Sequence, residues 1–64
     1  MVIRYDKAID AIYIKFSDDK VAESDEEKPG IILDYDEAGN VVGIEVLNAS
    51  SKMKQPNGVT YEVA

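Results

Sequence analysis

The stretch IILDYDEAGNVVGIEVL, residues 31–47, decides the fold. Apolar side chains alternate with other residues on both sides of an acidic turn, and many of them are β-branched or aromatic. Such period-two alternation is typical of half-buried β-strands. Asp36 stands at the first position of the turn, and Gly39 stands where a positive φ is needed. The stretch therefore predicts a β-hairpin closed by a type I turn and a bulge.

The residues before this hairpin predict a second one. Segments 1–5 and 11–17 alternate in the same way, and the polar segment 6–10 between them has the length of a hairpin loop. Segment 21–27, VAESDEE, is compatible with a charged edge strand or with a loop, because charge on an edge strand blocks stray pairing. The KPG sequence at 28–30 then breaks the chain.

The residues after the central hairpin predict a short helix. Segment 48–55 opens with capping residues and ends before a proline. We expect Asn48 or Ser50 to be the N-cap and Met53 to contact the core.

Together these elements predict a single small domain over residues 1–64. The fold class is mainly β (α+β): a small antiparallel β-meander sheet of four to six strands with one short C-terminal helix. Residues 53–64 are expected to be flexible or to form a final strand, because 59–63 alternate again. The residues expected to form the core are Ile3, Tyr5, Ile12, Ile14, Phe16, Leu33, Val42, Ile44, Val46 and Met53.

Size and composition point to self-association. The chain has 64 residues with no Cys and no His, which removes disulfides and the usual zinc sites as stabilisers. A domain of this size gains little net stability from burial alone. Apolar residues also remain for the second face of the sheet. We therefore expect a homo-oligomer, most simply a homodimer.

Charge excludes several classes of partner. The formal net charge of −6 repels phosphate backbones and anionic membranes, so we expect no nucleic-acid or membrane partner. No apolar run approaches a membrane span, and the N-terminus lacks a signal pattern, which predicts a cytoplasmic protein. A basic protein partner or a bound cation would be attracted by the negative electrostatic field of the chain. The acidity also fits a role in solubility alone.

The acidic residues of the central hairpin are the candidate metal ligands. They are Asp34, Asp36 and Glu45. With Gly39 they fit positions of an EF-hand calcium loop, but Ala38 occupies a ligand position and no helix can precede the loop. The hairpin explains every residue of the match, and weak cation binding is the alternative interpretation. Paired carboxylates also serve in acid–base catalysis, although nothing in the sequence predicts a cleft.

The chain carries no recognisable catalytic set. It lacks a Cys nucleophile and a His base, its serines have no motif around them, and its glycines form no phosphate-binding loop. We therefore expect no catalytic residue and no cofactor. Gly43 is unusual because glycine inside a strand often marks a bulge or the close approach of another backbone. We expect the helix or a second subunit to cross the sheet there.

Several separate segments resemble one family. In order they are Tyr5-Asp6, DAIYI at 10–14, VAES at 21–24, PGIILDYD at 29–36, Gly39, VVGIEVL at 41–47 and Ala49-Ser50. Over about residues 2–52 the chain resembles the small prokaryotic family catalogued as domain of unknown function 2283. The resemblance implies a compact, mostly antiparallel β domain of cytosolic prokaryotic type. It implies no activity, cofactor or catalytic residue.

Two functional hypotheses follow. The first is a non-enzymatic, homo-oligomeric protein-interaction module, one form of which is an antitoxin-like partner of a small basic toxin. The second is a small-molecule or cation-binding protein, or a minimal enzyme, that uses the acidic hairpin. If Asp34, Asp36 and Glu45 converge at a pocket or an interface, the second hypothesis gains support. If they point separately into solvent, it loses support.

Overall fold

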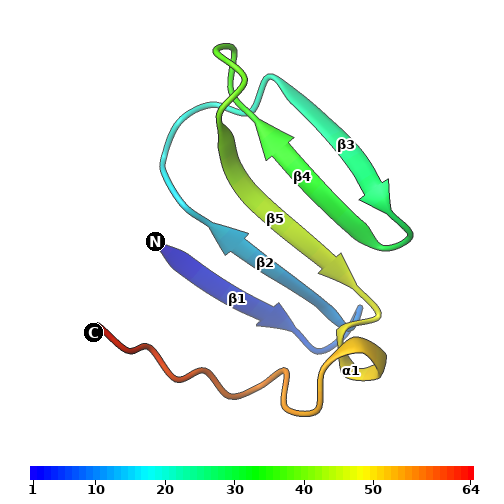
Figure 1. Ribbon diagram of the computed structural model, residues 1–64. Coiled ribbons are helices and arrows are strands. Elements are labelled where there is room, and N and C mark those ends of the chain that lie inside the picture. The colour runs from blue at the N-terminus through cyan, green and yellow to red at the C-terminus, as the bar shows by residue number, and fades with distance from the viewer.

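The computed structural model describes all 64 residues (Figure 1). The chain forms one antiparallel sheet and a short helix, joined by turns and loops. The elements are β1 (Val2–Asp6), β2 (Ala11–Lys15), β3 (Glu23–Lys28), β4 (Ile31–Tyr35), β5 (Val41–Leu47) and α1 (Ala49–Lys52). This arrangement confirms the predicted fold class, a mainly β chain with a short helix after the last strand. None of its helical structure is long and apolar enough to cross a membrane.

The strand order departs from the sequence order at one place. The order across the sheet is β1-β2-β5-β4-β3, so the meander covers only β3, β4 and β5, and β5 pairs with β2. The segment between β2 and β3 runs around the end of the sheet to reach the far edge (Figure 1). Burial explains this order. All six residues of β3 are exposed, as suits a charged edge strand, whereas β5 carries buried residues and lies at the centre.

The central hairpin forms as the sequence predicts. Leu33 and Ile44 are paired across β4 and β5, and the ladder shifts register next to Asp34. The Gly39 amide donates to the Asp36 carbonyl at 3.1 Å, and Gly39 has a φ of 85°. This left-handed conformation is the reason that the turn requires glycine.

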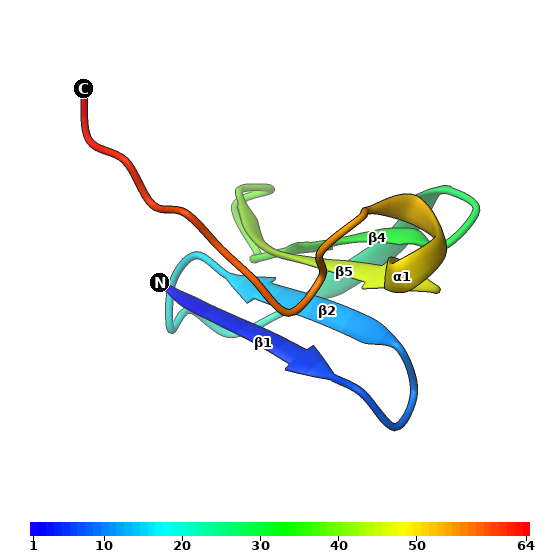
Figure 2. The same cartoon turned by 90° about the horizontal axis from the view of Figure 1, so that it is seen from below.

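The core lies on one side of the sheet, beneath α1. Ile12, Val46 and Ala49 are its buried residues, and Met53 packs against them as predicted. Figure 2 shows α1 on this side, close to β5. We call this side the apolar face. Its strand residues are Ile3, Tyr5, Ile12, Ile14, Ile31, Leu33, Val42, Ile44 and Val46.

The predicted core is only partly covered. The helix has four residues and reaches one end of the sheet. Ile3 therefore remains 42% exposed and Phe16 43% exposed. Their assignment to the core is wrong for the single chain, since no second layer lies over them.

The C-terminal segment forms no strand within the chain. A turn closes where the Gly58 amide donates to the Gln55 carbonyl, and the chain then leaves the sheet on the side of α1 (Figure 2). Val59, Tyr61 and Val63 alternate like a strand, yet they are 63%, 75% and 82% exposed. Of the two alternatives that the sequence left open for residues 53–64, a final strand is not formed within the single chain.

Candidate functional site

A row of polar side chains crosses the side of the sheet opposite the apolar face. The register places Asp34 of β4 between Gly43 of β5 and Ser24 of β3, with Tyr13 of β2 on the same side. We call this side the polar face. Four neighbouring strands thus each contribute one residue to a single cluster.

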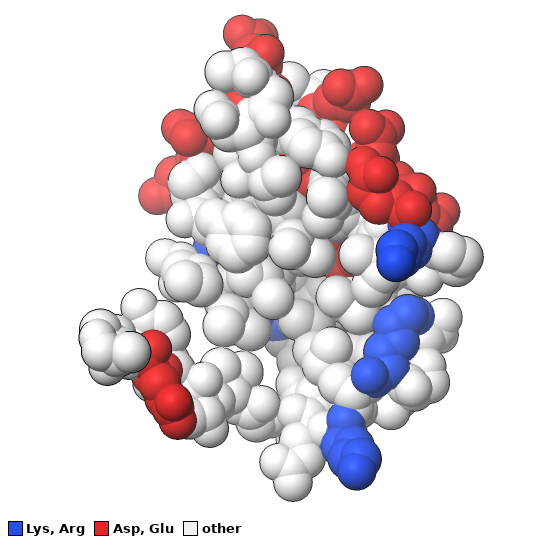
Figure 3. Space-filling model, in the orientation of Figure 1, with Lys and Arg blue, Asp and Glu red and all other residues white.

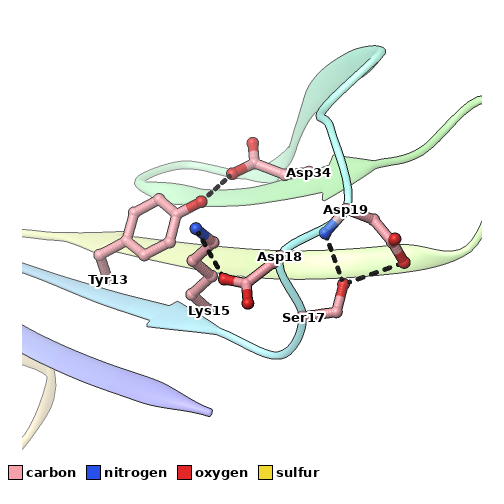
Figure 4. Close-up of polar contacts among 6 residues, drawn as sticks. All are labelled: Tyr13, Lys15, Ser17, Asp18, Asp19 and Asp34. Carbon is pink, nitrogen blue, oxygen red and sulfur yellow. Dashed lines mark hydrogen bonds and ion pairs between the residues drawn. The ribbon is translucent and has the colours of Figure 1, made fainter.

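Asp34 is the centre of this cluster. The Tyr13 hydroxyl donates to Asp34 Oδ2 at 3.1 Å, and the Ser24 hydroxyl donates to Oδ1 at 2.6 Å. Figure 4 shows the Tyr13 ring reaching over β5 toward Asp34. The Asp34 residue is only 3% exposed, so its carboxylate depends on these two hydroxyl donors. No buried side-chain nitrogen or oxygen in the chain lacks a hydrogen-bond partner.

Gly43 leaves the space in which the Tyr13 side chain crosses β5 to reach Asp34. A Cβ at Gly43 would lie 3.0 Å from the Tyr13 hydroxyl oxygen and 3.2 Å from the Ile14 carbonyl oxygen. Within the chain the nearest side-chain group is therefore the Tyr13 phenol and not the helix, one of the two neighbours that the sequence suggested. Burial raises the pKa of Tyr13 above its ordinary value, and the hydrogen bond to Asp34 raises it further.

The Asp36 carboxylate stabilises the β4–β5 turn in which it lies. Its carboxylate accepts from the Ala38 amide at 3.0 Å, from the Asn40 amide at 2.9 Å and from the Asn40 side chain at 3.2 Å. The bonds from Asn40, followed by those from Ala38 and Gly39, hold the pKa of Asp36 below its ordinary value. This is the usual role of aspartate at the start of a turn.

Glu45 occupies a third environment. It lies half-buried on β5, between Tyr13 of β2 and Ile32 of β4. Its negative charge is a minor contributor to the raised pKa of Tyr13. Asp34, Asp36 and Glu45 thus have separate surroundings, and no three His, Cys, Asp or Glu residues form a group that could hold a metal ion.

A second polar cluster, centred on Asp10, was missed by the sequence reasoning. Tyr5 donates its hydroxyl to Asp10 Oδ1 at 2.8 Å, and Ser50 donates its amide to the same oxygen at 3.0 Å. The Ser50 hydroxyl donates to Oδ2 at 2.6 Å. The Ala49 amide also donates to the Asp10 carbonyl at 2.9 Å. Asp10 therefore caps α1 from a loop forty residues away.

This arrangement corrects the predicted cap. Asn48 occupies the N-cap position with a φ of 52° and makes no side-chain cap hydrogen bond, while Ser50 donates to Asp10 instead of capping. The sequence could not show a cap that comes from a distant loop. The available signal was that Tyr5, Asp10 and Ser50 all fall in the segments that carry the family resemblance.

The Asp10 cluster is better suited to structure than to catalysis. Hydrogen bonds from Ser50 and then Tyr5 hold the pKa of Asp10 below its ordinary value. The bond to Asp10 raises the pKa of Tyr5. A carboxylate with a lowered pKa is a poor general base for the Ser50 hydroxyl. The cluster clamps α1 to the β1–β2 loop.

Comparison with known families agrees with the resemblance. Residues 2–50 match a family described as protein of unknown function, DUF2283. The chain belongs to the DUF2283 family. Both the Tyr13–Asp34–Ser24 and Tyr5–Asp10–Ser50 clusters lie inside the matched residues, and the C-terminal segment lies outside them. No curated protein and no solved structure matches the chain.

Proposed function

We propose that this member of the DUF2283 family is a non-enzymatic, homo-oligomeric protein-interaction module whose apolar face binds a second copy. The observation that carries this proposal is the open part of that face. Only four hydrophobic residues of the chain are buried, and α1 covers one end of the sheet. Single sheets require a second layer for stability, and this chain provides a small part of one.

The exposed area supports the proposal. A folded monomer of this mass is expected to expose about 4,100 Å² by the usual scaling with mass. The chain exposes 4998 Å². The extended C-terminal segment and the open apolar face both contribute to the excess, which is about 900 Å². Each partner in a standard protein interface buries about 800 Å², so the excess is similar in size to the area that one copy would bury in a dimer.

The pattern of charge on this side also supports the proposal. Figure 3 shows a broad, mostly white centre with only small patches of charged atoms, and most of the charged side chains lie around its border. Interface cores are depleted of charge while their rims are polar. The fold also explains why the face is apolar, because paired positions such as Ile3 with Ile14 and Leu33 with Ile44 carry aliphatic side chains.

Neighbouring residues of β1 provide a matched test. Ile3 lies on the apolar face at 42% exposure, and Val2 lies on the polar face at 56% exposure. In sedimentation equilibrium at micromolar concentration we expect a dimer for the wild type and for Val2→Lys. We expect Ile3→Lys to be monomeric with an unchanged far-ultraviolet circular dichroism spectrum. A monomeric wild type, or an Ile3→Lys variant that dimerises as well as Val2→Lys, contradicts the proposal.

A second candidate function concerns the acidic edge strand. Four of the six residues of β3 are acidic and all six are exposed, and the outer edge of β3 has no partner strand. A basic protein partner, as in an antitoxin-like role, has a complementary charge for this edge. We expect the tagged protein to retain such a partner from lysate at low salt and to release it at high salt. The variant Glu23→Gln/Asp25→Asn should lose it, and equal retention by that variant excludes β3 as its site.

A further inference from the structure

The charges around the apolar face are segregated toward opposite ends of the strands. Figure 3 shows most Asp and Glu side chains around the upper part of this face and Lys side chains at its lower right. β2 and β4 end at the upper end of the sheet, and β3 and β5 end at the lower end (Figure 1). The acidic end carries Asp18, Asp19, Asp36 and Glu37 with Lys20 among them, and the lysine end carries Lys28, Lys52 and Lys54 with Asp6, Glu26 and Glu27 nearby.

Each end is a contiguous feature. Segments 19–22 and 36–38 line one shallow hollow, so the acidic loops are neighbours. At the other end, a Cβ on Gly30 would lie 2.7 Å from Lys52 Nζ, which places this lysine beside the β3–β4 turn. Carboxylates at both ends have partners within the chain: Glu26 accepts from the Gly30 amide at the lysine end, and Asp18 pairs with Lys15 at 3.4 Å at the acidic end, which leaves Glu37 without such a partner.

We infer that two copies pack face to face in reversed orientation, so that the acidic end of each lies over the lysine end of the other. This inference rests on the proposed function, since it describes how that dimer is arranged. A two-fold axis in the plane of the interface can run along the strands or across them. An axis along the strands places the acidic end of one copy against the acidic end of the other, and these ends repel each other because each chain has a net charge of −6. An axis across the strands sets opposite charges together at both ends.

Zero-length cross-linking reports directly how the two copies are oriented relative to each other in the dimer. Unlabelled and ¹⁵N-labelled chains are mixed, treated with a carbodiimide that joins lysine amines to carboxylates, and digested for mass spectrometry. Mixed-isotope peptides report links between copies. We expect Lys28 and Lys54 to be linked to Asp18, Asp19 or Glu37 of the other copy. Mixed-isotope links from these lysines to Asp6, Glu26 or Glu27 overturn the inference but keep the dimer. Links confined to single-isotope peptides overturn both.

Charge exchange gives an independent measurement. Glu37 and Lys54 are exposed and make no side-chain hydrogen bond within the chain. At low salt, Glu37→Lys or Lys54→Glu should each raise the dimer dissociation constant about five- to tenfold, because each change alters two symmetric contacts. The double variant Glu37→Lys/Lys54→Glu should return to within about twofold of the wild type. Arg4→Glu on the polar face is the control. A double variant as weak as the product of the two singles overturns the inference.

Discussion

The Tyr13 hydroxyl donates a hydrogen bond to the buried carboxylate of Asp34 across an intervening strand. The two residues lie on β2 and β4, and β5 runs between them. We expect Tyr13→Phe to lower the free energy of unfolding by about 1 kcal/mol, because the buried carboxylate loses one of its two hydroxyl donors. Chemical denaturation of Tyr13→Phe, Ser24→Ala and the double variant checks this. A double variant as stable as the wild type would show that Asp34 does not depend on these donors.

Gly43 should be the glycine most sensitive to substitution on the polar face. We expect Gly43→Ala to destabilise the fold by about 1–3 kcal/mol, since the added methyl group crowds the Tyr13 hydroxyl and the Ile14 carbonyl. The cost should fall in a Tyr13→Phe background, where the hydroxyl is gone. Gly58→Ala is the matched control, because its nearest neighbour would be 3.9 Å away. Equal effects of the two alanine variants would refute the role given to Gly43.

Asp10 should control the formation of α1. We expect Asp10→Ala to increase the amide exchange rates of Ser50 and Met53 on the order of tenfold, because the helix loses its cap while the sheet persists. Asn48→Ala is the control, since Asn48 makes no side-chain cap hydrogen bond. Hydrogen exchange followed by nuclear magnetic resonance separates the two. Because Asp10 and Asn48 both have a positive φ, alanine strains both positions alike, and equal exchange rates in the two variants would show that the Asp10 side chain is not the cap.

The helix clamp should also respond to acid. The folded-state pKa of Asp10 lies below its ordinary value of 3.8, so this group stabilises the fold above that value. The stabilisation is lost as the pH falls from about 3.8 through the lower folded-state pKa. We expect the Ser50 amide resonance to shift in this window in the wild type. In Asp10→Asn that shift should disappear, and its persistence would assign the transition to another carboxyl group.

The segment after α1 should be dispensable for the fold of the single chain. Residues 55–64 contribute no strand and stay largely exposed. We expect a chain that ends at Lys54 to keep its circular dichroism spectrum and to change the melting temperature by less than about 3 °C. Loss of the fold on truncation would mean that Tyr61 contributes packing beside Met1 and Ile3, with which it lines a shallow hollow.

Local patterns predicted the strands well and the distant contacts poorly. The alternation around Asp36 and Gly39 identified the central hairpin, because turn chemistry and side-chain period act within a few residues. The pairing of β2 with β5 and the cap from Asp10 join parts of the chain that no local pattern links. Phe16 was assigned to the core because its position in the alternation is correct, but periodicity does not show whether a second layer exists.

For the candidate site too, the sequence predicted local features and missed the contacts between distant segments. Asp34, Asp36 and Glu45 were identified as one acidic group because they are near in sequence, yet each has its own environment. Asp34 illustrates the difficulty. Its position predicts only a face of β4, and its burial depends on Tyr13 and Ser24 from two other strands.

The placement of β5 beside β2 also bears on how the chain folds. β1 and β2 form a unit of neighbouring residues, and β3, β4 and β5 form another, whereas the ladder between β2 and β5 joins residues about thirty positions apart. Closing that ladder requires a long loop to be ordered before any contact compensates for the lost entropy, so it should set the rate. The Asp10 clamp spans the same join. Folding should therefore resemble the docking of two preformed halves, and α1 should form only after they meet.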